Sequence, residues 1–151
     1  MTVCGSRFPG RLDDGVSAMR FIRCSVVFAA ALALAGCALG INKDSPSVSY
    51  TVPRDYRTVF LRVQNQANEC LRGKNEYTVQ ARVDPATQSG EIEVVGPLGG
   101  TVVARTELRA TDAQHTHLTQ TVWGRHPWDA QALDAMRQSV RMDMSVCFAY
   151  R

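Results

Sequence analysis

Three histidines, His115, His117 and His126, lie close together in the second half of the chain. Neutral imidazoles are common ligands of zinc and copper, and residues two apart on a strand face the same side, so this group could form a metal site. No acidic or thiolate ligand is obvious beside them, and the strand alternation would turn Leu118 inward and the histidines toward solvent. The pattern therefore favours solvated strand histidines, and we expect no cofactor.

Other catalytic arrangements do not stand out in the sequence. Glu91 and Glu93 alternate with apolar residues, which is typical of the solvated face of a strand and not of the buried, opposed carboxylates of a glycosidase. The chain has no Gly-x-Ser-x-Gly elbow, and the glycines between Gly96 and Gly100 lack the ending of a phosphate-binding loop. We expect that the protein is not an enzyme.

Two large aromatic residues, Trp123 and Trp128, bracket a short basic segment that contains Arg125 and Pro127. Such aromatics are often core anchors at the corner between two elements, and this is the favoured interpretation. If they are exposed, Trp123, Arg125 and Trp128 are the best candidates for a binding edge.

An apolar run over residues 25–33 is preceded by Arg20 and Arg23 and followed by Leu34-Ala35-Gly36-Cys37. It is too short to span a membrane as a helix, which takes about 20 residues. In its basic start, apolar centre and small-residue ending, the segment 19–37 resembles the signal peptide of bacterial lipoproteins. The resemblance implies cleavage before Cys37, attachment of palmitate-like acyl chains to this residue, and a domain held at a membrane surface.

The segment before Met19 fits this leader poorly, because Asp13 and Asp14 place negative charge in a region that should be basic. We predict that translation starts at Met19, that residues 1–18 are a mis-assigned upstream extension, and that 19–36 are the signal peptide. The residue after Cys37 is Ala38, whereas lipoproteins retained at the inner membrane typically carry aspartate there. The resemblance thus implies the periplasmic face of the outer membrane, within the cell envelope.

Cleavage at Cys37 leaves Cys70 and Cys147 as the remaining cysteines of the folded part. An even pair in an oxidising compartment predicts a structural disulfide, which would stabilise the fold by roughly 4 kcal/mol. Two buried free thiols, or a metal or redox pair, are the alternatives. A separation of 77 residues, however, lacks the Cys-x-x-Cys spacing of redox and zinc motifs.

The charge of the chain is nearly balanced once the leader is removed. Four of the 17 basic residues and two of the 14 acidic ones precede residue 37, so 13 and 12 remain and the net charge is near +1. A nucleic-acid-binding domain would carry a clustered basic face, and we expect no nucleic-acid partner. The remaining 115 residues are the size of one domain.

Hydrophobic periodicity predicts the elements of that domain. Residues 37–47 are polar and indicate a lipidated, flexible tether. A short strand is expected over 48–52, a helix from about 53 to 71, strands near 77–83, 92–95, 101–110 and 115–122, and a helix from 128 to about 147 whose last residues could instead be extended. We therefore predict that residues 48–151 form a single periplasmic α+β domain. It would be a two-layer sandwich, in which a four-stranded antiparallel meander is flanked by an N-terminal and a C-terminal helix. A short extra strand would precede the first helix.

The predicted disulfide conflicts with the simplest tracing of this fold. Both cysteines lie on the apolar stripes of the two predicted helices, but four up-and-down strands between them place the helix ends at opposite ends of the sheet. Either the last helix crosses diagonally, or the strand count is off by one, or the cysteines are not bonded to each other.

This element order is similar to the helix-grip arrangement of some outer-membrane lipoproteins, including the accessory lipoproteins of the barrel-assembly machinery. The likeness covers about residues 48–148 and implies a fold, not a function. Two functions are compatible with the sequence. The first is a non-catalytic, membrane-anchored interaction or envelope-accessory module with an envelope protein as partner. The second is a carrier of a small apolar ligand between helices and sheet, with Met136 and Met144 as lining candidates.

Overall fold

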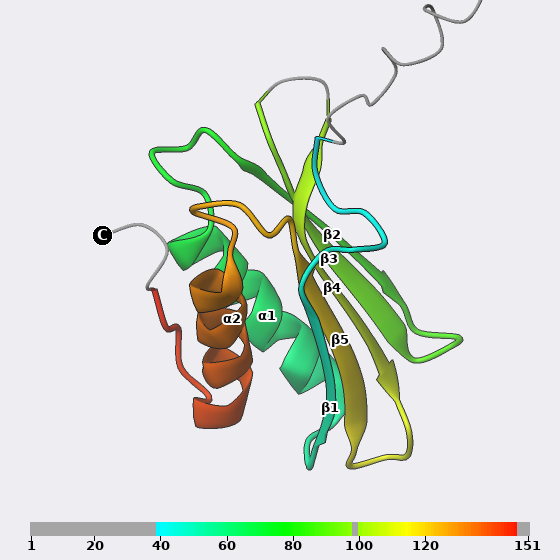
Figure 1. The fold of residues 1–151 in the computed structure, drawn as a ribbon. Helices are drawn as coiled ribbons and strands as arrows, with labels where there is room; N and C mark the ends of the chain where they lie inside the picture. The colour runs from blue at the N-terminus through cyan, green and yellow to red at the C-terminus, as the bar shows by residue number, and fades with distance from the viewer. Residues whose placement is uncertain (1–38, 98–99, 148–151) are drawn as a thin grey trace, which may run out of the picture. The chain divides into compact units, whose positions relative to one another are not determined.

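Two helices lie side by side on one face of an open antiparallel sheet (Figure 1). This computed structural model describes residues 39–97 and 100–147; the leader, the predicted start at Met19 and the lipidation site Cys37 lie outside the described residues. The elements in chain order are β1 (Ser47–Val52), α1 (Tyr56–Cys70), β2 (Thr78–Asp84), β3 (Ser89–Val95), β4 (Val102–Ala110), β5 (Thr116–Val122) and α2 (Ala130–Met142). The predicted α+β class is confirmed.

The sheet has five strands in the order β1-β5-β4-β3-β2, one more than the four-stranded sheet that the sequence predicts. Strands β2 to β5 form the predicted meander. The short strand before the first helix, β1, joins the same sheet and pairs antiparallel with β5 from Ser47 opposite Thr121 to Val52 opposite Thr116. This pairing makes β1 one edge of the sheet and β2 the other.

The core fills the space between the helices and the inner face of the sheet. Apolar residues at spacings of three and four on both helices meet the inward residues of the strands, as the periodicity predicts. The residues of this core that are at most 2 % exposed are Val59, Val63, Ala67, Leu71, Ile92, Val94, Ala104, Leu118, Val122, Trp128, Ala132, Met136 and Val140. Among the described residues, neither helix is long and apolar enough to cross a membrane.

An aspartate caps the N-terminus of each helix. The side chain of Asp55 accepts hydrogen bonds from the backbone N–H groups of Arg57 and Thr58, both at 3.1 Å, and Asp129 accepts one from Gln131 at 2.9 Å. These bonds satisfy N–H groups that the first turn of a helix leaves without a partner. The caps explain why α1 and α2 start where they do.

Replacing this cap by Asp55→Ala should lower the free energy of unfolding by about 1 kcal/mol at pH 7. Hydrogen bonds from the side chain and then the backbone of Thr58 lower the pKa of Asp55. The stabilisation is therefore complete above the unfolded pKa of about 3.9 and is lost as the pH falls through the lower folded value. Urea unfolding of both proteins should show a smaller difference at pH 3 than at pH 7. An equal difference at the two pH values would contradict this account.

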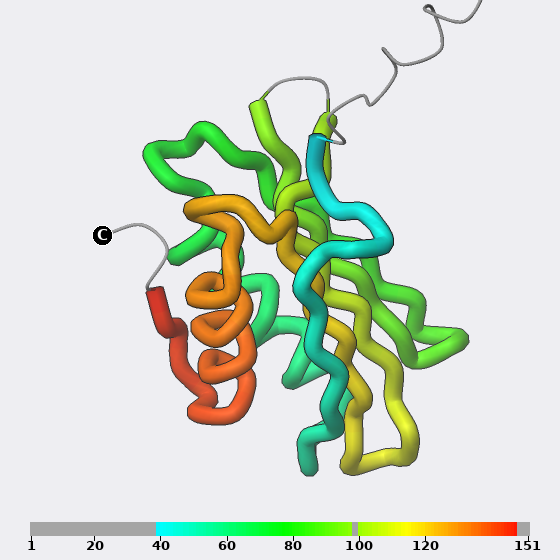
Figure 2. Tube along the Cα trace, in the orientation of Figure 1, coloured from blue at the N-terminus to red at the C-terminus, as the bar shows by residue number. Residues whose placement is uncertain are grey.

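A disulfide joins Cys70, the last residue of α1, to Cys147, with the two Cα atoms 4.9 Å apart. The predicted helix to about residue 147 is too long, and the alternative of a non-helical end holds, because α2 ends at Met142 and Asp143 adopts a left-handed conformation with φ of 55°. The chain then reverses and runs back beside α2, as Figure 2 shows. This return, and not a diagonal helix, brings Cys147 to the end of α1 and resolves the conflict between strand count and disulfide.

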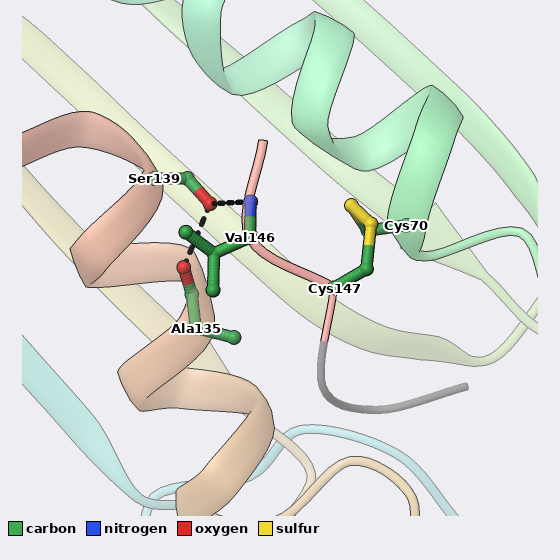
Figure 3. Close-up of a disulfide and its surroundings, with 5 residues drawn as sticks. All are labelled: Cys70, Ala135, Ser139, Val146 and Cys147. Atoms are coloured by element: carbon green, nitrogen blue, oxygen red, sulfur yellow. Dashed lines mark hydrogen bonds between the residues drawn. A yellow bond between two sulfur atoms is a disulfide. The ribbon is translucent and has the colours of Figure 1, made fainter. Parts of the chain in front are cut away.

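The buried hydroxyl of Ser139 holds the returning segment against α2 (Figure 3). It donates to the carbonyl oxygen of Ala135 at 2.8 Å and accepts from the N–H of Val146 at 2.9 Å. In a continued helix the Val146 N–H would donate to a backbone carbonyl oxygen one turn earlier. Here the Ser139 hydroxyl takes the place of that acceptor. The arrangement positions Cys147 for its bond to Cys70.

Residues 40–46, expected as part of a flexible tether, lie against the sheet instead. The N–H of Ile41 donates to the carbonyl oxygen of Val102 at 2.9 Å, and the carbonyl oxygen of Pro46 accepts from Val122 at 3.0 Å. At Gly40, with φ of 92°, an added Cβ would meet the Val102 oxygen at 2.6 Å, so only glycine fits this approach. The ordered domain therefore begins before β1.

Candidate functional site

The three histidines are exposed and each has its own neighbour. His115 Nδ1 lies 2.9 Å from Asp112, His117 Nδ1 lies 3.2 Å from the hydroxyl of Thr51, and His126 Nδ1 lies 3.6 Å from Asp129. Within residues 39–97 and 100–147, no three His, Cys, Asp or Glu side chains are close enough together to hold a metal ion. The structure does not bring the histidines into one site.

The two tryptophans occupy different environments. Trp128 is 0 % exposed and packs edge-on against Tyr77, with ring centroids 4.9 Å apart. It is a core anchor, which is the interpretation that the sequence favours, and the binding-edge role does not hold for Trp128 because it required exposure. Trp123 is half-buried, and the guanidinium of exposed Arg125 lies 5.2 Å from the centroid of its ring. These two residues form a surface pair beside the core.

The face of the sheet that the helices leave open is polar. Arg105 binds Glu93 at 2.7 Å and lies 3.3 Å from Glu91, so these carboxylates belong to an ion-paired strand face. On the neighbouring pair of strands, hydroxyl groups meet directly across the ladder: Ser47 with Thr121 at 2.9 Å, and Ser49 with Thr119 at 2.8 Å. Opposite charges and paired hydroxyls stabilise the face while keeping it hydrated.

Two hollows lie along one seam, between edge strand β1 and helix α2, and we call this seam the β1–α2 groove. One hollow has a volume of about 150 Å³ and the other about 220 Å³. The first is lined by Val48, Ala130, Leu133, Asp134 and Arg137, and the second by Thr51, Val52, Pro53, Arg54, Val140 and Arg141. The lining combines apolar side chains with an arginine-rich rim.

Tyr50 lies on β1 between the strand residues that line the two hollows. Its hydroxyl donates to Gln120 Oε1 at 2.9 Å, and Gln120 Nε2 lies 3.5 Å from Thr106 Oγ1, so a polar chain runs from the groove into the core. The guanidinium of Arg141 lies 5.5 Å from the centroid of the Tyr50 ring. Burial raises the pKa of Tyr50 to about 12, although Arg141 and Arg137 act in the opposite direction. Tyr50 is therefore a neutral hydrogen-bond donor at neutral pH.

A Tyr50→Phe substitution should lower the free energy of unfolding by about 1 to 3 kcal/mol at pH 7, because it leaves the buried Gln120 oxygen without a donor. The raised folded pKa gives a stabilisation that is complete below the unfolded pKa of about 10 and is lost as the pH rises toward 12. Urea unfolding should thus show a smaller difference between the two proteins at pH 11 than at pH 7. Tyr56→Phe is the control, since the Tyr56 hydroxyl contacts the Arg57 guanidinium and not a buried amide. An equal loss in both variants would contradict the assigned role.

Positive charge exceeds negative charge around the groove. Asp143 lies 3.5 Å from Arg54 and 2.9 Å from Arg62. Asp134 binds Arg137 at 2.6 Å, and within the described part of the chain Arg141 has no carboxylate partner. Among the residues that line the two hollows, three arginines (Arg54, Arg137 and Arg141) therefore face one carboxylate (Asp134), which leaves an excess of two positive charges.

The outer edge of β1 is unpaired, because β5 is its only neighbouring strand among the described residues. The Val122 N–H donates to the Pro46 carbonyl oxygen, and antiparallel ladders alternate between bonded and non-bonded pairs. This alternation directs the backbone groups of Val48, Tyr50 and Val52 toward β5. The residues between them are Ser47, Ser49 and Thr51. Their N–H and C=O groups therefore point away from β5, outward from the free edge of the sheet.

The groove residues carry no sequence motif that marks them as a site. Val48 and Tyr50 gave a strand signal and Leu133 gave a helix signal, but no local pattern indicates that these two elements lie side by side. The count of arginines on α2 was the available hint, since Arg137 and Arg141 are four residues apart on one face. No protein-family model matches the chain, and the comparison with curated proteins finds no significant relative.

Proposed function

We propose that this chain is a lipid-anchored, non-catalytic module at the periplasmic face of the outer membrane, and that it binds another envelope protein. The observation that carries the proposal is the β1–α2 groove, where an unpaired strand edge, apolar side chains and an excess of positive charge adjoin. Unpaired strand edges are templates for pairing with another chain. The lipoprotein-like leader supports the location.

The interior gives less support to the carrier of a small apolar ligand. The pocket at the centre of the sandwich, lined by residues such as Val63, Leu71 and Ile92, has no room for a water molecule. Met136 is a buried core residue, whereas Met144 is 55 % exposed and does not line this space. A ligand of drug size needs a cavity of about 300 Å³ or more. The protein-binding function is therefore the one we retain.

Site-specific photo-crosslinking in intact cells tests the proposal. A photoreactive amino acid at Leu133 places the crosslinker in the groove, and one at the exposed Asn65 of α1 is the matched control. We expect a discrete protein adduct from position 133 and none from position 65, identified by mass spectrometry. A small molecule bound in stoichiometric amount, with no protein adduct from position 133, would favour the carrier instead.

The anchor is tested separately. Metabolic labelling with an alkyne analogue of palmitate should label the wild-type chain, and Cys37→Ser should abolish the label and release the protein from the membrane fraction. Retention of both label and membrane association in the variant would overturn the lipoprotein part of the proposal.

A further inference from the structure

We propose that the partner enters the β1–α2 groove as an extended acidic peptide that pairs with the free edge of β1 and becomes a sixth strand of the sheet. This inference rests on the proposed protein-binding function and specifies the kind of partner segment that would bind. Strand addition draws its affinity from main-chain hydrogen bonds and its specificity from pockets for alternate side chains. The groove supplies both.

The backbone groups at the free edge of β1 are directed so that they can form the main-chain hydrogen bonds. The N–H and C=O groups of Ser47, Ser49 and Thr51 point away from β5, so they can bond with a strand about 4.8 Å further out. Residues 40–46 lie against β4 and β5 and do not pair with this edge. The edge is therefore open to an incoming backbone.

Alternate side chains of the incoming strand would point toward α2. There they meet apolar Val48 and Leu133 in the first hollow and the cationic rim of Arg137 and Arg141 beside it. The Arg141 guanidinium lies over the Tyr50 ring and has no carboxylate partner among the described residues, so an incoming carboxylate can pair with it without breaking an existing ion pair. Charge-assisted hydrogen bonds to arginine are among the strongest available. The peptide should thus carry apolar and acidic residues at every second position.

The remaining side chains of the peptide would continue the polar face. The hydroxyl pairs formed by Ser47 and Ser49 with β5 end at this edge, and a strand beside them would extend the same rows. Polar residues such as threonine fit these positions because they pair across strands and keep the face hydrated. The expected pattern is threonine or serine alternating with valine or glutamate.

The charge distribution favours β1 over the opposite edge of the sheet. A hollow of about 360 Å³ beside edge strand β2 is lined by Arg82 and by the three acids Asp84, Glu91 and Glu107. Asp84 is on β2, whereas Glu91 and Glu107 are on the neighbouring strands β3 and β4, so the hollow beside this edge carries excess negative charge and would repel an acidic strand. The two edges of one sheet therefore differ in the sign of the charge that they accept.

The test uses the full chain, purified in detergent, and a fluorescent heptapeptide with threonine at odd positions and valine, glutamate and valine at even positions. Binding is measured by fluorescence anisotropy. Ser49→Pro removes the edge N–H without removing a backbone hydrogen bond to β5. Ser49→Ala is its matched control, because both variants lose the hydroxyl that pairs with Thr119 and only Ser49→Ala keeps the edge N–H. Arg141→Glu reverses a rim charge, and Arg109→Glu reverses an exposed charge on the open face. We expect Ser49→Pro and Arg141→Glu each to weaken binding about tenfold or more, and the two controls to change it less than about twofold.

Hydrogen exchange by NMR locates the bound peptide. Peptide binding should slow exchange of the Ser49 and Thr51 amides, which are open in the free protein, and leave the already bonded Tyr50 amide unchanged. Equal affinity for a peptide with lysine in place of glutamate, or protection on β2 in place of β1, would overturn this inference. If position 133 still crosslinks to a protein in that case, the proposed function survives. If it does not, both fail.

Discussion

Removal of the Cys70–Cys147 disulfide is expected to lower the free energy of unfolding by about 4 kcal/mol, because the bond closes a 77-residue loop and restricts the unfolded chain. Small domains are stable by about 5 to 15 kcal/mol, so this loss removes a large share of the total. The double variant Cys70→Ala/Cys147→Ala should unfold at a much lower urea concentration than the oxidised wild type. Reduced wild type should behave like the variant.

Ser139→Ala separates the covalent bond from the docking of the segment that it holds. This variant keeps the disulfide but removes the hydroxyl that binds Val146, and it should cost only about 1 to 2 kcal/mol. If the cysteine variant lost no more stability than Ser139→Ala, the loop-closure account would be wrong. Urea unfolding of the three proteins at pH 7 is the measurement.

Trp128→Ala should cost about 3 to 5 kcal/mol, since the side chain is fully buried and its removal leaves a large cavity. The ring joins the corner after β5 to the core and packs edge-on against Tyr77, so the loss includes this aromatic contact. Near-ultraviolet circular dichroism and urea unfolding should show a weakly stable variant at 25 °C.

Trp123→Ala is the matched control, because Trp123 is half-buried and its ring contacts the solvent-exposed Arg125. It should cost clearly less than Trp128→Ala. An equal loss would mean that burial does not separate the roles of the two tryptophans. Binding of a partner should be measured only for Trp123→Ala, where the domain is expected to stay folded.

The sequence predicts the parts of the fold that local patterns determine. Alternation over residues 77–122 gives the four meander strands, since each pairs with its neighbour in the chain across a short turn. Spacings of three and four, with Asp55 and Asp129 as caps, give the two helices. Alternation also indicates which face of β5 is buried, so Leu118 is inside and His117 is outside.

Features that depend on distant partners could not be predicted in this way. Strand β1 pairs with β5, whose residues are about 70 positions further on, and no local pattern specifies that choice. The spacing of Val140, Met144 and Cys147 continues a helical pattern beyond the point where Asp143 turns left-handed, so it extended the predicted helix too far. The groove could not be predicted for both reasons. One of its walls is β1, whose pairing partner is distant in the sequence, and the other is α2, whose end was predicted too late.

The position of the disulfide along the chain also determines how the domain would respond to pulling. Strands β2 to β5 and helix α2 all lie between Cys70 and Cys147 and form a covalent ring, whereas β1 and the rest of α1 precede it. Tension applied at residue 39 could draw out only residues 39–69, a length of about 100 Å at roughly 3.5 Å per residue. Strand β1 is the first element on that path. Mechanical load on the amino-terminal side would therefore remove one wall of the groove while the meander stays closed.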